Sequence, residues 1–252
     1  MFKPDIIGSY DFYLKEKAKS NDNIRKKQKE DRYSSSAAGM CTKQQWYKKF
    51  KPNLEQPFSD EMMRTFEVGN LLDKSFDAGV SLIYRTNKYS QDYIKDDDLN
   101  IGGSFDLLLV DESGNAFLYD YKTTNSYTFN HVYGKPKTIN GNQSGDHNKF
   151  QLGTYALILE NKYKEKYNFK KIQYMALIGF EKNFSAMKEL EVDLKYIEFA
   201  ERYWKEAHPI IKSPIEPLPS TTVPYEDWNC KYCSFNLSCQ NPTNPKYKGK
   251  TK

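Results

Sequence analysis

The residues GSFDLLLVDESGNAFLYDYK, which run from Gly103 to Lys122, contain two apolar runs that are rich in β-forming side chains. The runs are Phe105–Val110 and Ala116–Lys122, and the polar cluster Asp111–Asn115 between them is typical of a turn. We therefore expect an antiparallel β-hairpin at the centre of the fold.

This hairpin places acidic side chains opposite each other. A turn centred on Ser113 sets Asp106 opposite Asp120, with their Cβ atoms about 5 Å apart. Like charges in this position are destabilising, so the pairing favours a divalent cation between them. Magnesium and manganese both prefer carboxylate oxygens. A register slip of one residue would remove this geometry.

Lys122 lies two residues after Asp120 and shares its face of the strand, because strand side chains alternate. Its ammonium group can orient or help to deprotonate an attacking water, or stabilise the charged transition state of phosphodiester hydrolysis. An ordinary solvated strand face would carry the same two residues. Asp106 in register with them is what favours a catalytic site.

Helical and strand patterns extend this hairpin in both directions. Ser59 and Asp60 are typical N-caps, and the apolar spacing after them predicts an amphipathic helix over residues 60–78. The polar segment 123–146 predicts a long loop. The other expected elements are a strand at Val80–Arg85, a loop at Thr86–Asn100, a helix over 147–165, strands at Ile172–Phe180 and Glu189–Leu194, and a helix at Tyr196–Ala207.

In this order the segments resemble the PD-(D/E)XK nuclease superfamily, in its RecB-like branch. Asp106 matches the first acidic ligand, and Asp120-x-Lys122 matches the (D/E)-x-K element. Gln151-x-x-x-Tyr155 matches the Q-x-x-x-Y helix motif, whose two residues project from one helix face. The resemblance implies an α/β fold with a mixed central sheet flanked by helices. It also implies that Gln151 supports the site and that Tyr155 approaches DNA.

One position departs from the family pattern. The family places a histidine four residues after a glycine on the first core helix, whereas Gly69 is followed at that spacing by Asp73. An aspartate also binds hard cations, although Glu67 and Asn70 are alternatives on the same helix and Asp73 also fits an ordinary surface acid. The implied metal ligands are Asp73, Asp106, Asp120 and the carbonyl of Tyr121.

Cysteine spacing indicates a second metal centre. Cys230, Cys233 and Cys239 crowd into ten residues, and Cys41 lies far upstream. In a cytosolic protein this spacing favours metal binding over disulfides. The pattern resembles the iron–sulfur nucleases, which include CRISPR-associated RecB-like exonucleases and the nuclease domain of AddB-type subunits. It implies a [4Fe–4S] cluster that ties the two ends of the chain together, with a structural Zn²⁺ site as the alternative.

The chain has 252 residues and a formal net charge of +5, and it contains no apolar run as long as a membrane span. Its N-terminus shows no signal-peptide pattern, so the expected location is the cytoplasm and no membrane partner is expected. The expected organisation is a polar arm or helix at 1–33, a nuclease core at 34–208 to which Cys41 belongs, a proline-rich connector and cluster segment at 209–242, and a basic tail at 243–252.

The residues and the resemblance together predict a magnesium- or manganese-dependent deoxyribonuclease. The resemblance implies single-stranded DNA as the substrate and an exonuclease rather than an endonuclease. Protein partners in a recombination or CRISPR adaptation complex are a further expectation. The alternative is a catalytically weak or inactive subunit that binds DNA or serves as an adaptor, which the missing histidine motivates.

Overall fold

The computed structural model describes residues 6–28, 32–84, 87–134, 138–139, 142–143, 146–218, 230 and 233–239. Its central sheet has five strands in the order β10-β9-β6-β5-β2. The parallel pair is β6 with β9, and the other neighbours run antiparallel, so the sheet is mixed. The strands are β2 (Lys88–Ser90), β5 (Leu107–Val110), β6 (Asn115–Thr124), β9 (Lys171–Glu181) and β10 (Met187–Glu191).

The hairpin that the sequence predicts is formed by β5 and β6. Leu107 pairs with Tyr119, and one further step along this register brings Asp106 beside Asp120. The turn is fixed locally, because Asp111 accepts a 2.7 Å hydrogen bond from the backbone amide of Asn115. Gly114 has φ +81°, a conformation that side chains rarely adopt. The predicted register is therefore confirmed.

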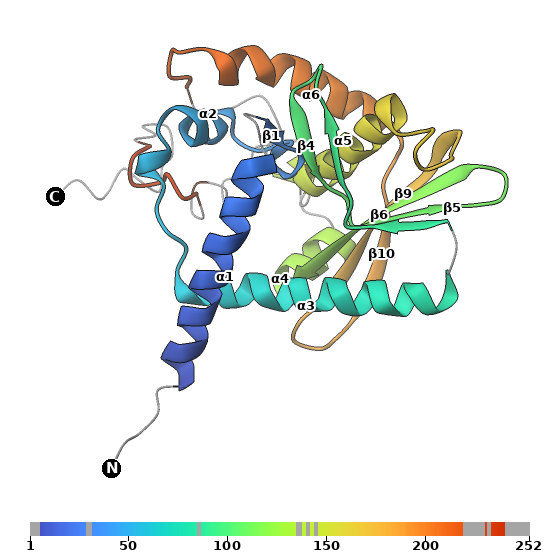
Figure 1. Cartoon of the computed structure of the whole chain (residues 1–252), viewed down its shortest axis with the longest axis horizontal. Helices are drawn as coiled ribbons and strands as arrows, with labels where there is room; N and C mark the ends of the chain where they lie inside the picture. The colour runs from blue at the N-terminus through green and yellow to red at the C-terminus, as the bar shows by residue number, and fades with distance from the viewer. Residues whose placement is uncertain are drawn as a thin grey trace.

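Helices cover both faces of the sheet (Figure 1). Helix α3 (Asp60–Ile83) runs along one face, where Phe76 contacts Tyr121 and Phe180. On the other face lie α5 (Asp146–Lys162) and α6 (Lys195–Lys212), which pack against each other. Their approach requires Gly153, because a Cβ atom there would overlap the carbonyl oxygen of Tyr196.

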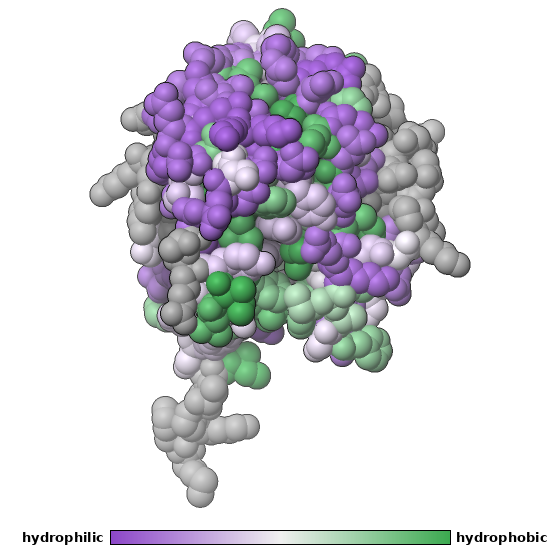
Figure 2. Space-filling model, turned by 90° about the vertical axis from the view of Figure 1, so that its right-hand side faces the viewer, coloured by the Kyte–Doolittle hydropathy of each residue, from purple (hydrophilic) through white to green (hydrophobic). Residues whose placement is uncertain are grey.

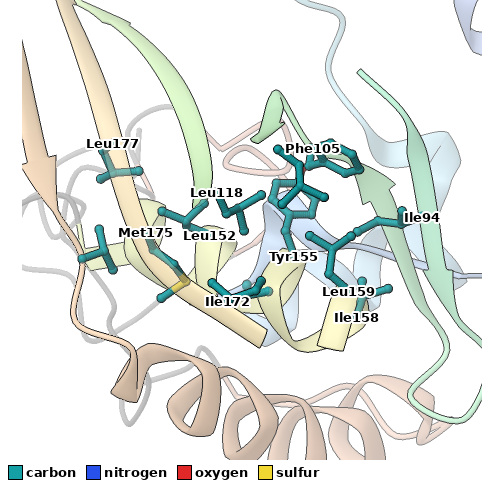
Figure 3. Close-up of a cluster of buried hydrophobic side chains, with 14 of the residues drawn as sticks. Ile94, Phe105, Leu118, Leu152, Tyr155, Ile158, Leu159, Ile172, Met175 and Leu177 are labelled. Carbon is teal, nitrogen blue, oxygen red and sulfur yellow. The ribbon is translucent and has the colours of Figure 1, made fainter. Parts of the chain in front are cut away.

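The hydrophobic core lies between the sheet and α5 (Figure 3). Trp204 of α6 is fully buried and donates a 3.0 Å hydrogen bond to Thr154 of α5, which satisfies its indole nitrogen. Burial of this apolar surface is the main source of stability. The core side chains that are drawn and labelled include Leu118, Leu152, Tyr155, Ile158, Leu159, Ile172, Met175 and Leu177.

Smaller elements precede the hairpin. Helix α1 (Ile6–Gln28) occupies the segment that was expected to be an arm or helix, and ion pairs join it to α3. A second sheet has the strand order β1-β4-β3 and lies beside α5. Its strands are β1 (Tyr33–Ser34), β3 (Tyr93–Asp96) and β4 (Ile101–Ser104), and the neighbouring helices are η1 (Ser35–Ala37), α2 (Thr42–Phe50) and η2 (Pro52–Leu54).

Two predictions between α3 and the hairpin are wrong. Residues 80–83 continue α3 instead of forming a strand, and Tyr84 closes the helix by donating to the carbonyl of Val80. A short apolar run fits either periodicity. Leu82 and Ile83 are 73% and 76% exposed, so no sheet buries them. Figure 2 faces this end of the molecule, where hydrophobic residues gather in the lower half.

The stretch Thr86–Asn100, which was predicted as a loop, contains β2 and β3. Both strands are short; the left-handed residues Asn87 and Gln91 flank β2, and the left-handed Asn100 precedes β4. These turn residues conceal the strands from a pattern that is based on alternation.

Residues after the hairpin also depart from the expected loop. The segment contains α4 (Ser126–Phe129), the π-helix η3 (Asn130–Gly134), β7 (Thr138–Ile139) and β8 (Asn142–Gln143). Helix α6 continues to Lys212 and includes Pro209, beyond its predicted end. Residues 219–229 of the predicted connector and the predicted tail at 243–252 lie outside the described residues. No described helix is long and apolar enough to cross a membrane.

Candidate active site

Asp106 lies immediately before β5 and is held by two hydrogen bonds. Its Oδ2 accepts from the backbone amide of Tyr121 at 2.7 Å, and its Oδ1 accepts from Nε2 of Gln91 at 3.2 Å. Gln91 was not singled out in the sequence, because its segment was taken for a loop and carries no motif. These bonds hold the Asp106 carboxylate beside β6.

Asp120 and Lys122 form an ion pair on one face of β6. Nζ of Lys122 lies 2.5 Å from Oδ2 of Asp120, whose side chain is 1% exposed. Burial raises the pKa of Asp120, with a further contribution from Asp106, while Lys122 opposes the rise. Burial alone would lower the pKa of Lys122, but Asp120 and Asp106 outweigh it and raise that pKa. Lys122 is therefore a cation in this site.

Gln151 connects α5 to this pair. Its Nε2 lies 3.4 Å from Oδ1 of Asp120 and 3.2 Å from the hydroxyl of Tyr155, one helical turn later. Tyr155 is 4% exposed and packs in the core (Figure 3). Because its hydroxyl accepts from Gln151, Tyr155 supports Gln151, and the implied contact of Tyr155 with DNA stays a prediction.

Helix α3 contributes Asp73 from the opposite side. Burial and the charge of Asp106 raise the pKa of Asp73 to about 6, and Lys122 opposes this rise. Asp73 is thus close enough to both residues for their charges to change its pKa. The alternative Glu67 instead forms a 2.7 Å ion pair with Lys17 of α1, and Asn70 donates to Glu67. Of the three candidates on α3, Asp73 is the one that interacts with the hairpin.

The donor chemistry of this site fits a hard divalent cation. The carboxylates of Asp73, Asp106 and Asp120 interact electrostatically, and the buried Oδ2 of Asp120 has the ammonium of Lys122 as its neighbour. Within the described part of the chain, no three aspartate, glutamate, histidine or cysteine side chains are grouped as a metal centre. The site therefore contains carboxylate oxygens of the kind that bind a hard cation, but no three of these carboxylates converge on one point.

The cysteines lie in a separate place, where the C-terminal segment of the described chain meets α2. Cys41 occupies the N-cap position of α2, and the C-terminal segment lies beside α2 (Figure 1). Fully buried Phe235 stacks on Tyr47 of α2 with ring centroids 5.3 Å apart, and Cys233 and Cys239 pack against this cluster. These contacts hold Cys233 and Cys239 against α2.

Electrostatic interactions link all four thiols. Burial, with smaller contributions from Cys41, Cys239 and Cys230, raises the pKa of Cys233 to about 11. Burial also raises the pKa of Cys239. The described cysteines form no disulfide, and no three of them are grouped closely enough to hold a metal ion. The thiols are thus neighbours without being arranged as a metal site.

The comparisons with known proteins concern nearly the whole chain. Residues 13–240 match the PD-(D/E)XK nuclease superfamily. No curated protein sequence matches this chain. Among solved structures, SSO0001 is similar with a TM-score of 0.54 and 15% identity, over 84% of this chain and 86% of that one. A candidate exonuclease from Eubacterium rectale has a TM-score of 0.39 and 12% identity, over 84% of this chain and 68% of that one.

The mixed sheet with helices on both faces agrees with the fold of this superfamily, and the match covers both the hairpin and α5. The chain belongs to the PD-(D/E)XK nuclease superfamily.

Proposed function

We propose that this chain is a metal-dependent DNA exonuclease of the RecB-like branch that hydrolyses phosphodiester bonds of single-stranded DNA. The observation that carries the proposal is the contact between Asp120, Lys122 and Gln151, beside Asp106 and Asp73. The family match supports a nuclease. The preference for single strands and for an end rests on the resemblance to RecB-like nucleases.

In this proposal the carboxylates of Asp73, Asp106 and Asp120 hold a magnesium or manganese ion, with the carbonyl of Tyr121 as a further ligand. Nucleases of this superfamily generally use divalent metal ions such as Mg²⁺. When bound, the ion polarises the phosphate that is cut and activates the attacking water. Removal of the ion should therefore stop cleavage while the protein remains folded.

Lys122 has the electrostatic role. Its Nζ is held by Asp120 and carries a positive charge, so it can orient the attacking water and stabilise the negative charge that develops on the phosphate. Gln151 has a positioning role, because its amide contacts Asp120 and is itself held by Tyr155. The helix thus limits the movement of the carboxylate on β6.

We also propose that Cys41, Cys230, Cys233 and Cys239 hold a [4Fe–4S] cluster. Thiolates are the ligands that such clusters use, and the four thiols interact electrostatically. A cluster would draw them closer and fasten the C-terminal segment to α2. A structural zinc ion has the same ligand chemistry, and metal analysis separates the two.

The nuclease proposal is tested by digestion of single-stranded DNA that is labelled at either end, with manganese or with a chelator. Wild type should shorten the strand only with metal, and Lys122→Ala should not. Lys205→Ala is the matched control, because Lys205 forms an exposed pair with Glu201 on α6. Intact DNA with folded wild type and metal would overturn the proposal, and equal cutting by Lys122→Ala would overturn the role of that lysine.

A further inference from the structure

A buried hydroxyl without a partner lies next to the candidate active site. It belongs to Tyr133 of η3, which is 9% exposed. In the described part of the chain this hydroxyl makes no hydrogen bond. Leaving a buried polar group unpaired is destabilising, and such a group in a folded protein calls for a specific explanation, such as an absent ligand.

A glycine makes room for this tyrosine on the sheet. Gly179 of β9 pairs with Lys122 of β6, so these two residues are side by side. A Cβ atom on Gly179 would lie 2.5 Å from Cζ of Tyr133, the ring carbon that bears the hydroxyl. The hydroxyl end of the ring therefore rests on the strand next to Lys122. The charge of Asp120 also reaches Tyr133, where it adds to the effect of burial in raising the tyrosine pKa.

The segment that carries Tyr133 is fastened at its start. Asn125 caps α4 by accepting from the amide of Thr128 at 2.8 Å. The hydroxyl of Ser126 donates to Glu181 at the end of β9, also at a short distance of 2.7 Å. The ring of Phe129 lies 5.2 Å from that of Tyr133. These contacts hold the tyrosine in one place over the sheet, as a preorganised binding group requires.

We propose that Tyr133 is a substrate-binding residue whose hydroxyl donates a hydrogen bond to a phosphate oxygen of the DNA strand, next to Lys122. The inference rests on the proposed nuclease function and adds one contact to it. Phosphate is the fitting ligand because it accepts hydrogen bonds from neutral hydroxyls and attracts the neighbouring lysine cation. Such a contact fixes the register of the strand without reading its sequence.

The test compares Tyr133→Phe with wild type, and uses Tyr174→Phe as the control because Tyr174 bonds to exposed Glu189. Three quantities are measured: the affinity for a single-stranded oligonucleotide in calcium, kcat and KM for cleavage in manganese, and the thermal midpoint. Tyr133→Phe should weaken DNA binding about three- to tenfold, which is the loss of one neutral hydrogen bond. KM should rise by the same factor at unchanged kcat, as expected for a contact made equally in both states.

Stability provides the sharpest part of this test. The Tyr133 hydroxyl bonds to no other group of the described chain, so its removal breaks no hydrogen bond within the protein. The thermal midpoint of Tyr133→Phe should therefore stay the same or rise while DNA affinity falls. A merely structural tyrosine would lose stability together with affinity. Gly179→Ala should also weaken DNA binding, because its methyl group displaces the ring, and this variant should lower the midpoint.

Several outcomes would overturn the inference. They are DNA affinity of Tyr133→Phe equal to wild type, a fall in kcat without a rise in KM, and a loss of stability parallel to the loss of binding. Cleavage by wild type with equal affinity of Tyr133→Phe would reject this contact alone. Binding without cleavage would reject the proposed function, and the affinity comparison would still decide the role of Tyr133. A wild type that neither binds nor cuts DNA would reject both.

Discussion

The carboxylate of Asp106 replaces a backbone carbonyl as the partner of β6, because its Oδ2 accepts a 2.7 Å hydrogen bond from the backbone amide of Tyr121. Strand β5 begins at Leu107, which pairs with Tyr119, so the side chain continues the ladder where the backbone pairing stops. One residue thus supports β6 and stands beside Asp120. The observed structural contact and the proposed metal-binding role therefore belong to the same carboxylate.

Asp106→Asn separates these two roles. The asparagine oxygen can still accept from Tyr121, so the thermal midpoint should stay close to wild type, whereas metal-dependent cleavage should fall about a hundredfold or more. Asp106→Ala should lose the same activity and also about 1 kcal/mol of unfolding free energy, since the amide loses its partner. Thermal unfolding and strand digestion measure the two effects. Equal stability of both variants would show that the hydrogen bond is unimportant.

Asp73 should determine how tightly the metal binds. Asp73→Asn removes the charge at nearly the same size, so the metal concentration for half-maximal cleavage should rise about tenfold or more. Asp73→His should weaken magnesium more than manganese, because imidazole suits softer cations. Metal titrations of cleavage measure both, with Asp193→Asn as the control for loss of an exposed acid. Unchanged metal dependence of Asp73→Asn would exclude Asp73 as a ligand.

Glu216 should make the docking of the segment after α6 sensitive to acid. Hydrogen bonds from Lys51, and next from Lys43 and Tyr47, lower the pKa of Glu216 from 4.5 to about 2. A carboxyl whose pKa is lower in the folded state than in the unfolded state stabilises the folded state when it is ionised in both. The contribution of Glu216 is therefore fully present above pH 4.5 and is lost as the pH falls towards about 2.

Trp46 reports on this docking, because its indole donates to the carbonyl of Ser213 at 2.8 Å. Acid titration of tryptophan fluorescence should show a transition in wild type that Glu216→Gln lacks or shows at reduced amplitude. Glu201→Gln on the exposed side of α6 serves as the control. The same acid transition in Glu216→Gln and wild type would contradict the prediction.

The hairpin and its register could be predicted because they depend on neighbours in sequence. The turn at Asp111–Asn115 fixes the pairing, and the pairing determines that Asp106 stands beside Asp120. The helix with Gln151 and Tyr155 was also expected, but it is not amphipathic, because its residues from Leu152 to Leu159 are all buried. Asp73 was predicted as a site residue from its spacing after Gly69, which follows a family motif.

Contacts between distant segments could not be predicted. Gln91 binds Asp106 from a stretch that has two short strands and no alternating pattern. Tyr133 packs on Gly179 from a segment whose sequence is typical of a polar loop. Gly179 belongs to no sequence motif, so the sequence gives no sign of this contact. The apolar end of α3 satisfies the pattern of a strand, and only the continued helix decides against it.

Cys233 gives the test of the proposed cluster, since it packs beside Phe235 and interacts with the other three thiols. Cys233→Ser, purified without oxygen, should lose bound iron and sulfide together with the visible absorbance of a cluster. It should also unfold at a lower temperature, because metal binding contributes to folding free energy. Ser234→Ala is the control, because Ser234 lies in the same turn and bonds to exposed Glu55. If wild type contains zinc, the site is a structural zinc site and the cluster proposal is wrong. If wild type contains neither iron nor zinc, both proposals are wrong.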